Sequence, residues 1–76
     1  KVSSAAEERQ LKKDLVRVER QMEKLDNEIL NLVQLQESVA FDAEKLIEAT
    51  ANLEKAQIKR SELEDEWLNL TLQLEG

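Results

Sequence analysis

The chain has 76 residues and a net charge of −6, and 37% of its residues are charged, yet it contains no Pro, no Cys, no His and a single Gly. This composition predicts long helices in one domain, and the missing Cys and His exclude disulfides, thiolate metal sites and the commonest general base. No apolar run approaches the roughly 20 residues that span a bilayer, and the first residues do not show the basic-then-apolar pattern of a leader, so we expect a soluble, cytoplasmic segment without a membrane partner.

Apolar residues in the first half of the chain recur at alternating intervals of four and three. They are Leu11, Leu15, Val18, Met22, Leu25, Ile29 and Leu32. This heptad spacing places all of them on one face of a helix, which we expect over residues 8–36.

The heptad pattern changes phase between about residues 33 and 43. Two interpretations fit: a stammer within one long rod, or a turn at which the chain reverses and two helices pack antiparallel. The segment lacks Gly and Pro, which weakens the turn, but Ser38 or Asp42 can cap a new helix. The two arms would have matching lengths of roughly 45 to 50 Å. We therefore expect a turn at about residues 37–42.

A second stripe with the same spacing follows, in an expected helix over residues 43–75. Its members are Leu46, Ala49, Leu53, Ala56, Arg60, Leu63, Trp67, Leu70 and Leu74. Trp67 occupies a core position, so we predict that it packs between the helices; a stacking platform for a base is the alternative. Arg60 is the polar exception and is expected to reach Glu64 or an acid on the other helix. The predicted fold is all-α, an antiparallel coiled-coil hairpin.

Basic residues gather on the first helix. They are Arg9, Lys12, Lys13, Arg17, Arg20 and Lys24. All except Lys12, which flanks the stripe, take outward heptad positions, and such a row of cations can follow a phosphate backbone. The alternative is an ordinary solvated surface with local ion pairs. Those pairs would be Glu8–Lys12, Asp14–Arg17 and Lys24–Glu28.

No group of residues points to catalysis. The acidic run ELEDE, residues 62–66, radiates around a helix, whereas hard cations need ligands that converge from loops. There is no Gly-rich phosphate loop and no nucleophile beside a base. We expect a segment that is not an enzyme, holds no metal or other cofactor and takes no small-molecule substrate.

Two stretches, EERQLKKDLVRVERQMEKLDNEI and FDAEKLIEATANLEKAQIKRSELEDEWLNL, resemble the C-terminal domain of ABC-F ATPases of the Uup type. The matching residues are Lys13-Asp14-Leu15 with Arg17, Glu19-Arg20-Gln21, Glu23-Lys24-Leu25, and Glu64, Trp67, Leu68 and Leu70. The chain departs from this family in its overall acidity and in lacking the basic linker.

The resemblance implies an antiparallel hairpin at the end of a cytoplasmic protein whose other domains bind ATP and magnesium. It also implies a role in binding DNA, ribosomal RNA or the ribosome, in connection with translation, with the six cations of the first helix as the contact residues. The alternative is a structural coiled-coil segment that mediates self-association or protein–protein interaction in a scaffold or tether. We expect a monomeric hairpin, with a coiled-coil dimer as the other possibility.

Overall fold

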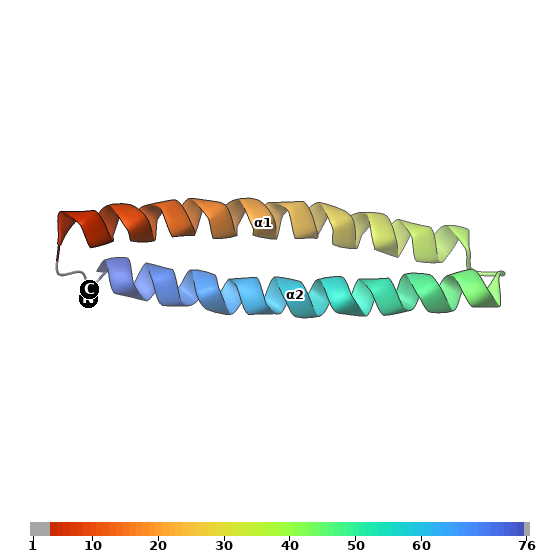
Figure 1. Cartoon of the computed structure of the whole chain (residues 1–76). Helices are drawn as coiled ribbons and strands as arrows, with labels where there is room; N and C mark the ends of the chain where they lie inside the picture. The colour runs from red at the N-terminus through yellow and green to blue at the C-terminus, as the bar shows by residue number, and fades with distance from the viewer. Residues whose placement is uncertain (1–3, 76) are drawn as a thin grey trace.

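The computed structural model describes residues 4–75, which form two long helices side by side (Figure 1). Helix α1 (Ala5–Ser38) and helix α2 (Ala43–Glu75) run in opposite directions, and the molecule measures 56 × 14 × 13 Å. The start of α1 lies beside the end of α2, and the connecting turn lies at the opposite end (Figure 1). This confirms the all-α hairpin and rules out the continuous rod. Helix α1 extends beyond residues 8–36 at both ends.

A serine side chain caps the start of α1. Ser4 has extended backbone angles, and its hydroxyl oxygen accepts a hydrogen bond of 3.1 Å from the backbone N–H of Glu7. Its carbonyl accepts a second bond of 3.0 Å from the N–H of Glu8. The two glutamates also place negative charge in the first turn, where the helix dipole favours it.

The turn between the helices is made without glycine. Val39 ends α1 at φ −108° and ψ 19°, and its N–H bonds to the carbonyl of Leu35. These angles are open to any residue, so Val39 does not need the left-handed region that favours glycine. Asp42 caps α2, since its carboxylate accepts a bond of 3.2 Å from the N–H of Lys45. The hydroxyl of Ser38 instead donates to the carbonyl of Leu35 within α1, so the Ser38 alternative for the cap was wrong.

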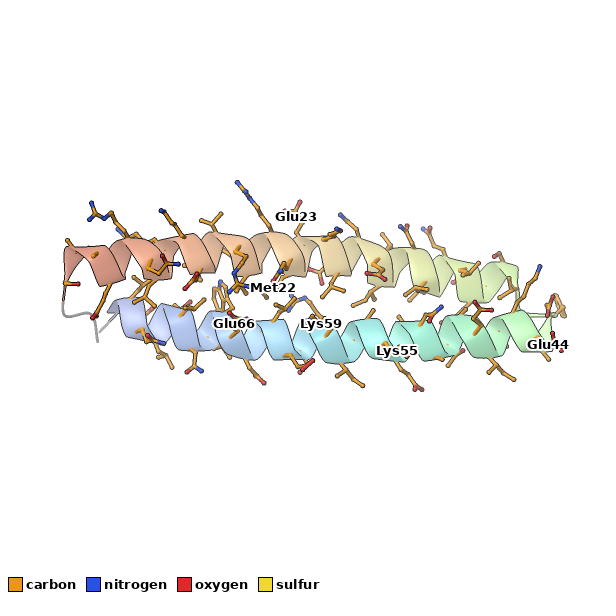
Figure 2. The ribbon with its side chains drawn as sticks, in the orientation of Figure 1. Met22, Glu23, Glu44, Lys55, Lys59 and Glu66 are labelled. Carbon is orange, nitrogen blue, oxygen red and sulfur yellow. The ribbon has the colours of Figure 1, made fainter. Side chains whose placement is uncertain are left out.

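The core is a single line of contacts between the helices. All members of both predicted stripes are buried or half-buried. Val18, Leu63 and Leu70 form the centre, with exposed fractions of 0%, 5% and 7%. The half-buried residues packed around them are Leu11, Leu15, Met22, Leu25 and Trp67. Figure 2 shows Met22 between the two ribbons and its neighbour Glu23 on the outer side of α1.

Trp67 lies beside this core and also makes a polar contact across the hairpin. Its indole Nε1–H donates a bond of 3.2 Å to Oε2 of Glu19 on α1. The ring therefore packs against the apolar centre while its polar edge reaches the surface, an arrangement typical of tryptophan at the rim of a core. This agrees with the packed position predicted for it.

Arg60 spans the boundary of the core and bonds to both helices. Its Nε donates to Oδ1 of Asp26 on α1 at 2.7 Å, and its Nη1 donates to Oε2 of Glu64 on α2 at 3.2 Å. The hydrogen bond to Asp26 is the largest cause that raises the pKa of Arg60 above its ordinary value. The sequence predicted Glu64 or an acid on the other helix as the partner, and the structure shows a contact of each kind.

Three polar pairs across the interface share one register. In each pair the two residue numbers have the same sum, as an unbroken antiparallel alignment requires. The pairs are Gln36 with Thr50, Asp26 with Arg60, and Glu19 with Trp67. They tie the hairpin together from the turn towards its open end.

Candidate nucleic-acid interface

Two of the six cations on α1 are engaged by carboxylates. Arg17 bonds through Nη2 to Oε2 of Glu66 on α2 at 2.6 Å, and through Nη1 to the side chain of Gln21 at 3.2 Å. The bond to Glu66 is the largest cause that raises the pKa of Arg17. Lys12 pairs more loosely with Glu8, at 3.8 Å. The charge of Arg17 is therefore largely committed to holding the two helices together.

The other four cations are exposed and form no ion pair within residues 4–75. These residues, called the basic row here, are Arg9, Lys13, Arg20 and Lys24. The last lies fifteen positions after the first on α1, or about 22 Å along the helix axis. Arg9, Lys13 and Arg20 supply positive charge on the outer side of α1, whereas Lys24 also lines a hollow shared with α2.

Two expected local pairs are replaced by other contacts or are absent. Asp14 accepts a hydrogen bond of 3.0 Å from the side-chain amide of Gln10 and makes no ion pair with Arg17. Lys24 and Glu28 line a common hollow without pairing, whereas the predicted Glu8–Lys12 pair is present. Lys24 thus forms no ion pair within residues 4–75.

Part of the basic row surrounds a shallow hollow on α1. The hollow has a volume of about 420 Å³, and its one apolar lining residue is Val16, which is 45% exposed. The cations that line it are Lys12, Lys13, Arg17 and Arg20. A hollow with one apolar and four cationic lining residues can receive a sugar against Val16 and a phosphate against the cations.

Sequence reasoning missed one cation that the fold adds to this region. Lys59 of α2 lines a second hollow, of about 200 Å³, together with Lys24 of α1. The sequence did contain a sign that Lys59 lies near the interface, because it directly precedes Arg60, which occupies a core position. Its nearness to Lys24 depends on the antiparallel register, which the sequence left open.

Some side chains of the acidic run at residues 62–66 form ion pairs, and the others are exposed to solvent without one within residues 4–75 or belong to the core. Glu66 pairs with Arg17 and Glu64 pairs with Arg60. Within residues 4–75 no group of three acidic, His or Cys side chains is arranged to hold a metal ion. In the same part of the chain, neither helix is both long and apolar enough to cross a membrane.

Comparison with protein-family models, with curated proteins and with solved structures finds no match to this chain. The resemblance to the C-terminal domain of Uup-type ABC-F ATPases therefore stays a prediction. The fold and the charge distribution are the evidence on which a function can be argued.

Proposed function

We propose that this hairpin is a non-catalytic accessory domain that binds the phosphate backbone of a nucleic acid through the outer face of α1. The observation that supports this most directly is the basic row, since four exposed cations on one helix face lack an ion pair within the described residues. Association with a cytoplasmic ABC-F ATPase follows from the sequence resemblance alone.

The contact would be electrostatic and independent of base sequence. Backbone contacts by Lys and Arg position a protein on nucleic acid without reading bases. The basic row and Lys59 are the residues assigned to it, whereas Arg17 serves the hairpin by holding Glu66. Because the whole chain carries a net charge of −6, we expect weak binding that depends strongly on salt.

The test measures binding of fluorescein-labelled duplex DNA and duplex RNA of the same sequence by anisotropy, as a function of salt. Five phosphate contacts, by the basic row and Lys59, predict a slope of log K against log salt of about −4.5. Arg20→Glu should weaken binding roughly tenfold, and Lys13→Glu combined with Arg20→Glu should abolish it at moderate salt.

Lys45→Glu is the matched control, because it changes net charge by the same amount near the turn, on α2 and away from the basic row. Equal losses for Arg20→Glu and Lys45→Glu would show that only net charge matters and would reject the assigned face. No binding of either duplex at low salt would reject the proposed function itself. A preference for RNA over DNA would decide between the two nucleic acids.

A second candidate function is structural, namely a helical segment that joins copies of a protein or binds another protein. The observation in its favour is a set of exposed apolar side chains on α2, on the side away from α1. They are Ile47, Ile58, Leu68 and Leu72. The nature of the partner for this face is considered next.

A further inference from the structure

Helix α2 carries a second row of residues with heptad spacing, on the face opposite the core. This outer row consists of Ile47, Ala51, Glu54, Ile58, Ser61, Asp65, Leu68 and Leu72. The exposed fractions of Ile47, Ile58 and Leu72 are 71%, 63% and 64%. Figure 2 shows side chains projecting from α2 away from α1 along its whole length.

Such a row is unusual for the solvent side of a coiled coil. The outward positions of a coiled-coil helix are normally polar, and those of α1 include Arg9, Lys13 and Arg20. Apolar residues at heptad spacing on two opposite faces are typical of a helix that packs between two neighbours. Helix α1 covers one face of α2 and the other is uncovered in the hairpin.

We infer that the outer row of α2 packs antiparallel against the same row of a second copy of this chain. In one register four of the five apolar residues of the row meet each other: Ile47 lies opposite Leu72 of the second copy, and Ala51 lies opposite Leu68 of the second copy. The centre of the interface pairs Ile58 with Ser61 of the second copy. The outer row is made of two heptad positions that alternate along the helix. In this register a residue at one of these positions always faces a residue at the other position in the second copy, as antiparallel coiled-coil packing requires.

Charge complementarity supports this register. Lys55 and Glu62 flank the outer row on one side, and both are exposed without an ion pair within residues 4–75. In this alignment Lys55 and Glu62 of the second copy flank the interface on the same side, offset by two residues from direct opposition, and the two-fold symmetry creates this pair twice. The same symmetry closes the assembly at two copies.

Other arrangements of the two rows are less favourable. A parallel pair places Ala51 on Ala51, which leaves a gap, and it stacks Asp65 on Asp65 without an opposite charge beside the row. Shifting the antiparallel register by one heptad places Ile47 against Asp65 of the second copy. The favoured register still opposes Glu54 to Asp65 of the second copy, so we expect association in the micromolar range rather than a permanent dimer.

Crosslinking tests the orientation directly, because the chain has no cysteine of its own. Ile47→Cys and Leu72→Cys are made separately, and the two proteins are mixed and treated with a short bismaleimide crosslinker. Antiparallel packing predicts a product that joins residue 47 to residue 72, in clear excess over either self-linked product. Predominant 47–47 and 72–72 products would overturn the orientation.

Sedimentation equilibrium over a hundredfold range of concentration tests the association itself. We expect a concentration-dependent dimer, which Leu68→Glu together with Leu72→Glu should convert to monomer. Leu30→Glu is the matched control, since Leu30 is 57% exposed on α1 and outside the interface. A constant monomer for the unaltered chain, or equal effects of the two sets of changes, would overturn the inference.

A charge reversal distinguishes a specific interface from nonspecific hydrophobic association. Lys55→Glu should weaken dimerisation about tenfold, because two attractive pairs become repulsive. Adding Glu62→Lys to the same chain should restore it, since each pair is then reversed in sign. Failure of the double variant to recover would overturn the assigned register. The basic row lies on α1, so a failure of nucleic-acid binding would leave this result unaffected.

Discussion

The sharpest test of the hairpin compares one leucine at the centre of the core with one leucine outside it. Leu63 is 5% exposed and contacts the cluster around Val18 and Leu70, whereas Leu30 is 57% exposed on the outer side of α1. Leu→Ala at a buried position costs about 2–5 kcal/mol through lost burial and the cavity left behind. We expect the lower half of that range, about 2–3 kcal/mol, because a core only two helices wide can close partly around the gap.

For a domain of this size, such a loss lowers the melting temperature by about 10–20 °C. Leu30→Ala should change the free energy of unfolding by less than about 0.5 kcal/mol, because its side chain is largely in water and alanine favours helix. Urea and thermal unfolding followed by circular dichroism at one low protein concentration measure both. Equal costs for the two substitutions would refute the reasoning that assigns the core to the facing stripes. If Leu63→Ala is unfolded at the outset, Leu63→Val gives a smaller, measurable loss.

Three further predictions concern the turn and the polar contacts. Asp42→Ala should cost about 1 kcal/mol in urea unfolding, because the N–H of Lys45 loses its acceptor, whereas Ser38→Ala should cost less than about 0.5 kcal/mol. Arg60→Leu should leave the urea midpoint unchanged or raise it, since an apolar side chain then completes the stripe. The ion pair that is lost, with a half-exposed carboxylate, contributes only ~0–1 kcal/mol. A lower midpoint would show that the charged pair stabilises the fold. Trp67 fluorescence should shift to longer wavelength at the same midpoint as the circular dichroism, and an earlier shift would mean that the ring is not packed in the hairpin.

The helices and their facing sides could be predicted because heptad spacing depends only on local geometry. All members of both stripes are buried or half-buried in the structure, and Arg60 reaches both helices as expected. The reversal was harder to predict, since the turn contains no Gly or Pro. Val39 ends the first helix with angles open to any residue, so no glycine is required at that position.

The contacts that depend on cross-helix register could not be predicted. Ser38 and Asp42 were equal candidates for the cap, and only the point at which the first helix ends decides between them. Arg17 takes an outward heptad position, yet its long side chain reaches Glu66, a partner that the sequence separates by 49 residues. The same register brings Lys59 beside Lys24. Partners outside the chain are beyond heptad reasoning, because heptads specify helix faces well and binding partners poorly.

The two helices divide the surface chemistry between them in a way that makes both proposals compatible. Helix α1 buries one apolar stripe and presents the basic row on its other side, whereas α2 presents apolar residues on both sides. Pairing two copies through α2 would place each α1 at an outer edge, with its basic row still in solvent. A dimer would then carry two cationic faces that point away from each other. Two such faces can hold separate segments of nucleic acid, and a duplex that reaches both gains effective concentration from the second contact. The net negative charge of the chain makes each contact with nucleic acid weak. Two such contacts are therefore sufficient for binding when the dimer forms.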